Sequence, residues 1–319
     1  MLSGLVIVDK PQGWTSHDVV ARMRRLAGTR KVGHAGTLDP MATGVLVIGI
    51  NRATRLLTYI VGTSKTYTTT IRLGQSTITD DAEGDVTGSH STEAITEEQL
   101  RAGVAKLTGE IQQVPSSVSA IKVNGERSYA RVRAGEDVKL AARAVSITRF
   151  DIHSWQRIQL VAEDGAPQQV IDLQATVECS SGTYIRALAR DLGEGLGVGG
   201  HLTALRRTAV GPYQIAQAKT LEELEKEFNL LEMSEAARAL MPVRELSEEE
   251  AVELSYGRRI AATDQLHSAE QPVAAFAPDG SLVALLEDPG SAGKYAKAVL
   301  VFAASGEQHT PGTAPRSAS

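Results

Sequence analysis

A carboxylate enclosed by glycines is the side chain in this sequence with the clearest chemical potential. Asp39 lies in residues 33–44, GHAGTLDPMATG, which hold three glycines and a proline. Glycine lets a backbone approach a ligand closely, and Pro40 fixes φ directly after the acid. Residues 45–50 are apolar and β-branched, which predicts a buried strand. A carboxylate held at the start of a strand can act as a nucleophile or base. The competing interpretation of the loop alone is an Asp-Pro turn that caps local N–H groups.

Four other side chains could act beside this carboxylate. Arg186 ends the run GTYIR, and a guanidinium can hold a carboxylate in fixed geometry, although this arginine taken alone would be placed on the surface. Tyr67 and Tyr184 offer aromatic faces, which can stack on bases taken out of a helix or simply pack in the sheet. His34 precedes Asp39 by five residues. Because no second histidine, cysteine or carboxylate follows at ligand spacing, we predict no metal site there.

Four motifs of this chain resemble, in the same order, those of the TruB-type tRNA pseudouridine synthases. The signature is residues 33–46; the others are VDKPQG at 8–13, KTY at 65–67 with IRLG at 71–74, and SSGTYIR at 180–186. Together they extend over roughly the first 210 residues. The resemblance implies an enzyme that cleaves the N-glycosidic bond of a uridine and rejoins the base through C5. The implied substrate is uridine 55 in the T loop of tRNA.

The resemblance also implies a role for each matching residue. Asp39 corresponds to the catalytic aspartate, and Arg186 corresponds to its ion-pair partner. Tyr67 stacks against the target uridine and accepts the C5 proton in the last step, while Tyr184 lines the same pocket. His34 fills the space that the displaced base leaves. Whether the aspartate attacks C1′ or C6 of the nucleotide stays open.

Two further residues are assigned to substrate binding on the same basis. Lys65 opens the second motif, and Asp81 lies in an acidic loop that resembles the family's substrate-contacting loop. Many family members carry Thr-Asp-Thr just before this acid, whereas this chain has TIT at 77–79. The neighbouring Asp80 therefore remains an alternative for the same role.

Bulk composition is that of an ordinary globular protein. The chain has 319 residues, 42% of them hydrophobic and 22% charged, which suits two domains. No apolar run reaches the ~18–20 residues that cross a bilayer, and the N-terminal residues do not resemble a signal peptide. Cys179 is the only cysteine, so the sequence allows no intrachain disulfide. We expect a cytoplasmic monomer with no membrane association, no obligate protein partner and, by resemblance, no metal or organic cofactor.

Charge is distributed unevenly along the chain. The net charge of −5 argues against a generic nucleic-acid binder, which is usually basic. Residues 1–75 nevertheless carry ten Lys and Arg against three Asp, a net charge of +7. A basic face on an acidic protein can still attract a polyanion locally. This distribution is compatible with binding of the tRNA T arm.

Hydrophobic periodicity predicts an α+β fold. We expect strands at 5–8, 45–50, 67–73 and 118–123, a strand pair at 144–155 and 168–179, and helices at 15–27, 52–61, 96–107 and 184–196, with a loop at 76–90. Thr96 and Gln99 form a capping-box pattern, and Gly28 is placed to end the first helix. Because the elements do not alternate as βαβ units, we expect a mixed, largely antiparallel sheet flanked by helices. This is the architecture of the pseudouridine synthase fold, which the resemblance implies.

A domain boundary is predicted near residue 240. Residues 1–240 form the expected catalytic domain, and residues 241–303 form a small β-rich domain with a hairpin at 272–286 and a strand at 295–303. In the resembled family this place is held by a PUA-like RNA-binding domain, which here matches by position and strand pattern only. Residues 304–319 are small, polar and proline-bearing, and are expected to be a disordered tail.

Two other classes of function compete with a synthase. A non-catalytic RNA-binding or RNA-folding protein could keep the scaffold, but the retained Asp39 argues against it, because binding a polyanion gains nothing from a buried carboxylate. A glycosidase would need a second carboxylate ~5–9 Å from Asp39. No Asp or Glu in the matched motifs obviously supplies that partner, and Arg186 would suit the site poorly.

Overall fold

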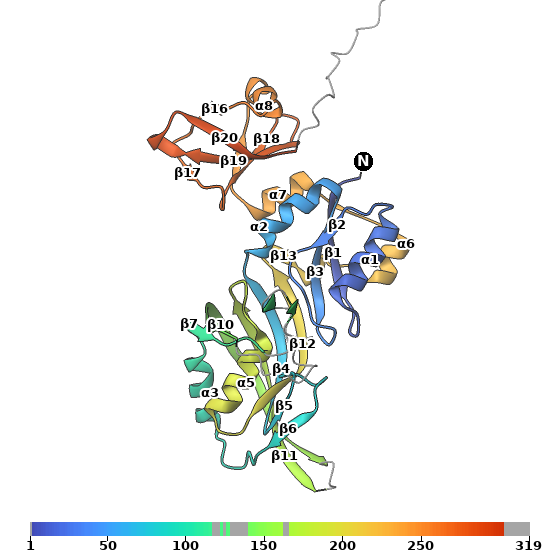
Figure 1. Ribbon diagram of the computed structural model, residues 1–319, viewed down its shortest axis with the longest axis vertical. Helices are drawn as coiled ribbons and strands as arrows, with labels where there is room; N and C mark the ends of the chain where they lie inside the picture. The colour runs from blue at the N-terminus through green and yellow to red at the C-terminus, as the bar shows by residue number, and fades with distance from the viewer. Residues whose placement is uncertain (1, 117–121, 124–125, 128–139, 162–165, 303–319) are drawn as a thin grey trace, which may run out of the picture. The chain divides into compact units, whose positions relative to one another are not determined.

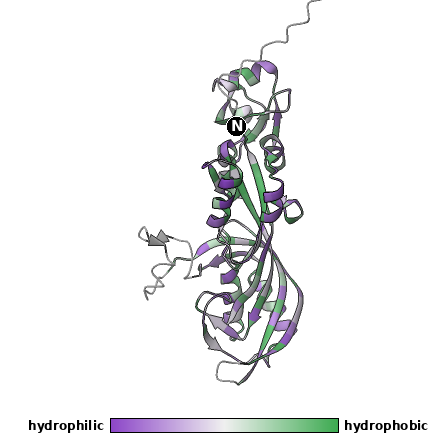
Figure 2. Cartoon of the chain, turned by 90° about the vertical axis from the view of Figure 1, so that its right-hand side faces the viewer, coloured by the Kyte–Doolittle hydropathy of each residue, from purple (hydrophilic) through white to green (hydrophobic). Residues whose placement is uncertain are grey.

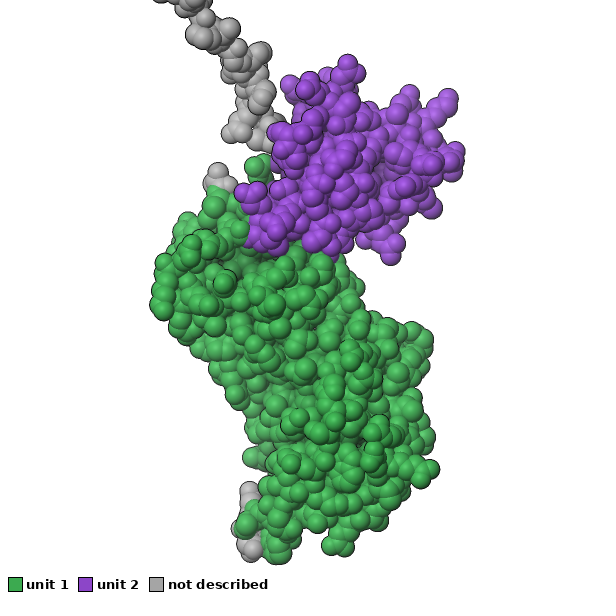
Figure 3. All heavy atoms as spheres, turned by 180° about the vertical axis from the view of Figure 1, so that it is seen from behind, with its two compact units in different colours: residues 1–230 green, residues 231–319 purple. Residues whose placement is uncertain are grey.

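The computed structural model describes residues 2–116, 122–123, 126–127, 140–161 and 166–302. The chain divides into two compact units, residues 1–230 and 231–319 (Figure 3). The boundary predicted from the sequence lies near residue 240. In the structure helix α7 (Met233–Leu240) is grouped with the second unit. The expected tail at 304–319 lies outside the described residues.

A large sheet forms the centre of the first unit (Figure 1). Its strands lie in the order β1 (Gly4–Lys10), β3 (Thr43–Ile50), β12 (Gly200–Val210), β4 (Lys65–Leu73), β11 (Pro167–Cys179), β10 (Arg143–Val161) and β7 (Gly109–Gln113). Only the β3–β12 pair along this order is parallel. The sheet is therefore mixed and largely antiparallel, which confirms the α+β prediction.

Short strands and helices complete the first unit. They are α1 (Ser16–Leu26), β2 (Val32–His34), η1 (Asn51–Leu56), α2 (Leu57–Val61), β5 (Gln75–Thr77), β6 (Val86–Ser89), α3 (Glu97–Lys106), β8 (Lys122–Val123), β9 (Glu126–Arg127), α5 (Ile185–Gly195), β13 (Tyr213–Gln214), η2 (Ile215–Gln217) and α6 (Leu221–Lys226). The predicted capping box of Thr96 and Gln99 opens α3, and Gly28 follows α1 with φ +61°. Both predicted helix boundaries are confirmed.

Two local predictions differ in detail from the structure, and a third lies mostly outside the described residues. The predicted helix at 52–61 is a 3₁₀ helix, η1, followed by the short α-helix α2. Asn51 starts η1 with φ 52°, and the N-cap residue Ile50 makes no side-chain capping hydrogen bond. The predicted loop at 76–90 contains the β5–β6 pair, whose strands are too short for a visible alternation. Most of the predicted strand at 118–123 lies outside the described residues.

Close backbone contacts hold the sheet and α5 together. Strand β3 is almost fully buried, whereas hydrophobic and hydrophilic residues both occur along the rest of the large sheet (Figure 2). Gly44 has φ +99°, and a Cβ built there would lie 2.2 Å from the carbonyl oxygen of Arg207 on β12. Gly193 on α5 approaches the Gly199 and Gly200 backbone just as tightly. These contacts let α5 and β3 pack directly against β12.

The second unit has a sheet and a core of its own. It comprises β14 (Leu231–Glu232), α7, β15 (Val243–Glu245), α8 (Glu248–Ser255), β16 (Ile260–Ala261), β17 (Leu266–His267), β18 (Val273–Phe276), β19 (Leu282–Pro289), η3 (Gly290–Ala292) and β20 (Tyr295–Val301). The sheet order is β15-β18-β19-β20-β16, and β18 and β19 form the predicted hairpin. Within the part of the chain that is described, no helix is long and apolar enough to span a membrane.

Replacing Gly193 by alanine should destabilise the first unit. The new Cβ would lie 2.1 Å from the Gly199 carbonyl carbon, so α5 must move away from β12. We expect a loss of about 1–3 kcal/mol in the free energy of unfolding, measured by urea titration. The control is Gly195→Ala at the end of the same helix, where a Cβ meets nothing within 4 Å. It should be neutral or stabilise by up to about 1 kcal/mol, and equal losses in both variants would refute the packing argument.

Candidate active site

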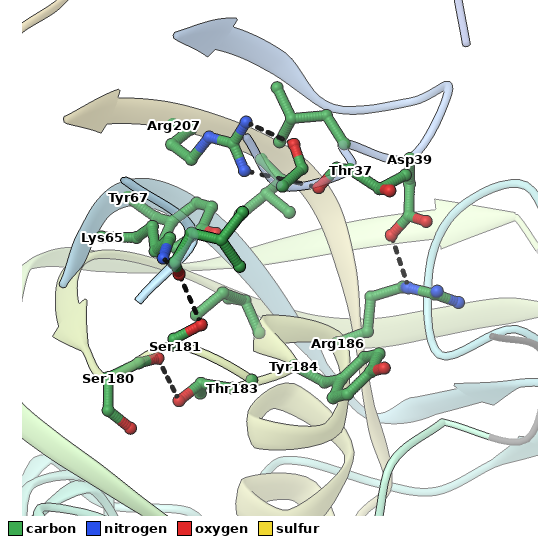
Figure 4. A pocket seen from close by; sticks show the side chains of 16 residues that line it. Thr37, Asp39, Lys65, Tyr67, Ser180, Ser181, Thr183, Tyr184, Arg186 and Arg207 are labelled. Atoms are coloured by element: carbon green, nitrogen blue, oxygen red, sulfur yellow. Dashed lines mark hydrogen bonds and ion pairs between the residues drawn. The ribbon is translucent and has the colours of Figure 1, made fainter. Parts of the chain in front are cut away.

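A cavity of about 260 Å³ opens where four segments of the first unit meet (Figure 4). The segments are the loop after β2, the start of β4, the loop before α5, and β12. The cavity is lined by Gly36, Thr37, Leu38, Asp39, Val61, Lys65, Tyr67, Ser180, Ser181, Gly182, Thr183, Tyr184, Ile185, Arg186, Leu205 and Arg207. Of the predicted site residues, His34 and Asp81 are absent from this lining. The remaining predicted residues come together although they are far apart in the sequence.

The backbone on both sides of Asp39 is tied to the start of the chain. The Ser16 hydroxyl donates to the Leu38 carbonyl (3.2 Å) and accepts from the Leu38 N–H (2.9 Å). The Pro40 carbonyl accepts from the Gly13 N–H (2.8 Å) and from the Lys10 ammonium (3.3 Å). Because its neighbours are fixed, the Asp39 carboxylate has a defined position at the cavity.

Arg186 holds that carboxylate from the first turn of α5. Its Nε lies 3.0 Å from Oδ2 of Asp39 (Figure 4), and its Nη1 donates to the Thr79 carbonyl at 2.8 Å. The Arg186 side chain is only 6% exposed, so it is not the surface residue that its sequence alone would suggest. The Asp39 side chain is 38% exposed, so the carboxylate is less buried than the sequence analysis assumed. The Asp39 carboxylate is thus paired with the Arg186 guanidinium and still accessible from the cavity.

Asp81 lies behind Arg186. Its Oδ2 is 3.5 Å from Nη1 of Arg186, and its Oδ1 accepts from the Thr79 hydroxyl (2.5 Å) and the Glu83 N–H (3.1 Å). The side chain is 4% exposed. In this structure Asp81 therefore contacts the arginine that holds Asp39, and a direct contact with substrate stays a prediction.

Asp80, the alternative to Asp81, points elsewhere. Its Oδ2 lies 3.3 Å from Nη1 of Arg190, and its backbone has φ 59°. Burial raises the pKa of the Asp80 carboxyl, and the nearby positive charge of Arg190 opposes that rise. Asp80 does not line the cavity, so its geometry favours a structural ion pair with α5.

Two tyrosines supply aromatic surface to the cavity. Tyr67 on β4 is 8% exposed, and burial raises the pKa of its phenol. Tyr184 is the N-cap residue of α5, where the Gln113 side chain bonds both its N–H (2.8 Å) and its carbonyl (3.1 Å). Burial raises the pKa of Tyr184 as well. Both phenols are therefore neutral at physiological pH, and the stacking and proton acceptance predicted for Tyr67 stay predictions.

The Lys65 ammonium donates its hydrogen bonds to backbone carbonyls of the protein. Its ammonium donates to the Val61 and Thr63 carbonyls, both at 2.5 Å, and the side chain is largely buried. Burial, aided by the nearby Arg207 charge, lowers the pKa of Lys65 to about 8. Lys65 thus fixes the turn between α2 and β4 at the cavity wall, and its predicted contact with substrate remains untested.

His34 lies on β2 outside the cavity lining. Its ring is 5.9 Å from the His17 ring in an edge-on arrangement, and its buried Nδ1 has no hydrogen-bond partner. Burial and the His17 charge lower the pKa of His34, so the imidazole is neutral at physiological pH. Among the described residues, no three His, Cys, Asp or Glu side chains gather as metal ligands.

Sequence reasoning missed two buried cations and an apolar wall. Arg207 is 1% exposed and lines the cavity, and Lys10 is fully buried, with a pKa that burial lowers to about 8. Leu205 forms an apolar wall of the cavity. The pair Arg206-Arg207 carried a usable signal, because consecutive strand residues face opposite sides and one arginine had to face the core side.

The glycosidase alternative would need a free second acid near Asp39. Asp81 shares Arg186 with Asp39, but it is bound to this arginine and to the Thr79 hydroxyl. Glu83 has a pKa raised by desolvation and by the charges of Asp81 and Asp39, yet it is exposed and does not line the cavity. Among the described residues that line it, the cavity therefore offers one accessible carboxylate paired with a cation, and not the pair of acids that glycoside hydrolysis uses.

Comparison with known families agrees with this geometry. The model of the TruB family pseudouridylate synthase (N terminal domain) matches residues 24–185. The model of the tRNA pseudouridylate synthase B C-terminal domain matches residues 186–247, and that of tRNA pseudouridine synthase II, C terminal, matches residues 241–303. The matches thus extend across both units.

Individual relatives are similar over nearly their whole length. A tRNA pseudouridine synthase B of Arthrobacter sp. (strain FB24) is 74% identical over 313 residues, covering 97% of this chain and 99% of that protein. A protein of the same name from Thermobifida fusca (strain YX) is 56% identical over 305 residues, covering 96% of this chain and 100% of that protein. Among solved structures, a chain of a Cbf5-Nop10-Gar1 complex has a TM-score of 0.66 at 24% identity, covering 94% of this chain and 84% of that chain. That likeness shows a shared fold.

Lys65→Met should change how stability depends on pH. The folded pKa of Lys65 lies near 8, below the ordinary value of 10.5, so between these values the unfolded chain binds more protons. Wild type should therefore gain stability over the variant as pH rises from about 8 to about 10.5, by at most about 3 kcal/mol. Urea unfolding of both proteins at pH 7.5 and pH 10 measures the difference. A difference in the free energy of unfolding that does not vary with pH would contradict a lowered pKa of Lys65 in the folded protein.

Proposed function

Because the chain belongs to the TruB family of pseudouridylate synthases, we propose that it converts uridine 55 in the T loop of tRNA to pseudouridine. As a member of this family the chain is an enzyme, an isomerase that acts on uridine in RNA. Its relatives at 74% and 56% identity are named tRNA pseudouridine synthase B, which supports tRNA as the substrate. The proposal adds the position in the T loop and the role of each residue.

The Asp39–Arg186 pair at the edge of the cavity is the observation that carries this proposal. The carboxylate is held at 3.0 Å by a buried guanidinium and remains 38% exposed, so it can reach a substrate without losing its orientation. The cavity is smaller than the ~300–1,000 Å³ pockets of drug-sized ligands, a size that suits one extruded nucleoside. Neutral Tyr67 and Tyr184 provide aromatic surface for a pyrimidine ring.

The reaction divides into four steps. The target base leaves its stack, which costs a few kcal/mol, and enters the cavity. Asp39 attacks the nucleotide at C1′ or C6, and the bond between N1 and C1′ breaks. The uracil turns while the aromatic side chains retain it, C5 bonds to C1′, and the bond between Asp39 and the nucleotide breaks, which regenerates the carboxylate. The proton lost from C5 is balanced by one gained at N1, so the product is an isomer of the substrate and no cofactor is required.

Binding of the T arm follows from charge and from the second unit. Residues 1–75 carry a net charge of +7, which attracts RNA phosphates, and we propose a PUA-like RNA-binding role for the second unit. We also propose that the enzyme acts as a cytoplasmic monomer without an obligate protein partner. An RNA-folding protein with this scaffold is the rival function, and it requires no chemistry from Asp39.

Asp39→Asn should abolish isomerisation without weakening RNA binding. The amide keeps the shape of the side chain but cannot act as a nucleophile. Tritium released from unmodified tRNA labelled at uracil C5 measures turnover, and carbodiimide-blocked primer extension locates the product. We expect at least a 10⁴-fold loss of rate for the variant, with wild-type behaviour in Asp85→Asn, whose carboxylate is exposed. No release by well-folded wild type that binds tRNA would favour the RNA-folding function.

His34→Ala should slow the reaction on folded tRNA more than on a relaxed substrate. If His34 takes the place of the extruded base, its loss leaves the unstacking energy of a few kcal/mol uncompensated, which corresponds to about tenfold or more in rate. A T-arm RNA whose loop pairing has been disrupted by mutation needs less extrusion. Single-turnover rates on both RNAs give the comparison. Equal losses on both substrates would contradict a role in base displacement.

A further inference from the structure

Arg207 is a buried cation that the mechanism above does not use. It lies on β12 and is 1% exposed. Among the described residues, no carboxylate lies within ion-pair distance of its guanidinium. Burying an ionised group without a counter-charge is costly, so the group must be held by well-placed hydrogen bonds.

The hydrogen bonds of Arg207 go to the loop that carries Asp39 and to the strand that follows this loop. Nη2 donates to the Gly36 carbonyl at 3.1 Å and Nη1 to the Thr37 carbonyl at 3.4 Å (Figure 4). Nε donates to the Val45 carbonyl at 2.7 Å. The first two acceptors precede Asp39 and the third follows it. One guanidinium therefore closes the loop that carries the carboxylate.

The backbone of Arg207 is fixed as firmly as its side chain. Strands β12 and β3 are parallel neighbours, with Arg207 opposite Gly44. The approach is so close that a Cβ on Gly44 would lie 2.2 Å from the Arg207 carbonyl oxygen. The backbone of Arg207 is therefore fixed relative to β3. Through the Arg207 guanidinium, the loop between Gly36 and Val45 is hydrogen-bonded to the sheet.

Arg207 also connects this loop to the stacking surface. On the other side of β12 it is paired in register with Tyr67 of β4, and the guanidinium is close enough for its charge to oppose the rise that burial causes in the pKa of Tyr67. The carboxylate and the aromatic ring come from distant segments, and Arg207 hydrogen-bonds the loop of the first and is the cross-strand partner of the second. The distance between the Asp39 carboxylate and the Tyr67 ring would determine how a bound uracil is placed relative to the carboxylate.

We propose that Arg207 is a positioning residue that sets where the Asp39 loop stands relative to Tyr67, and hence to the target nucleotide. The planar fork of arginine reaches three carbonyls in different directions, which the single ammonium of lysine cannot do. A displacement of about 1 Å at the reacting atoms can cost about 100-fold in rate, whereas binding of the rest of the RNA is unaffected. The inference rests on the proposed function, since it concerns the geometry of that reaction.

Arg207→Lys and Arg207→Gln test this role against a matched control. The control is Arg206→Lys, one residue away on the opposite face, where Arg206 pairs with Asp9 at 2.7 Å and is 41% exposed. For the full-length variants, single-turnover tritium release from C5-labelled tRNA gives the rate, filter binding gives the Kd for tRNA, and thermal unfolding gives the folded fraction. We expect both Arg207 variants to be folded at the assay temperature, with wild-type Kd and a rate reduced about 100-fold. The control should keep the wild-type rate and Kd.

Three results would overturn the inference. A wild-type rate in both folded Arg207 variants would show that the loop is placed without the guanidinium. Loss of folding in both would show that Arg207 serves the fold alone, and a raised Kd with an unchanged rate would show that it serves RNA binding. An inactive wild type would instead refute the proposed function, so the two failures are distinguishable.

Discussion

The site depends on one buried guanidinium with carboxylates on two sides. Arg186 lies 3.0 Å from Asp39, which faces the cavity, and 3.5 Å from Asp81, which faces the protein. A buried arginine needs charge compensation, and Asp81 supplies it permanently. Asp39 can therefore be directed by the guanidinium and still remain available to a substrate. Charge-assisted hydrogen bonds of this kind also fix orientation, which a nucleophile requires.

The surrounding structure keeps that arrangement rigid. Arg186 stands in the first turn of α5, whose Gly193 packs directly on the β12 backbone. On the other side, Ser16 and Lys10 hold the backbone beside Asp39. Catalysis by fixed dipoles and charges requires that these groups do not reorganise during the reaction. Tight glycine contacts and buried side-chain hydrogen bonds meet that requirement.

Local signals in the sequence predicted much of this fold and site. The capping box at Thr96, the glycine after α1 and the alternation in β4 identified elements correctly, and the motif around Asp39 identified the cavity. Long-range consequences could not be predicted in the same way. The burial of Arg207 and the contact of Asp81 with Arg186 depend on strand pairing between segments over a hundred residues apart. No local pattern reports which carbonyls a buried cation will meet.

The most direct test of the account is a crystal structure of the Asp39→Asn enzyme bound to an unmodified tRNA T arm. The account predicts that the target uridine is extruded into the cavity, with its base stacked on Tyr67. The side chain of residue 39 should lie about 3–3.5 Å from C1′ or C6, the range of a near-attack geometry. A uridine that stays stacked in the RNA, or that binds with residue 39 out of reach, would contradict it.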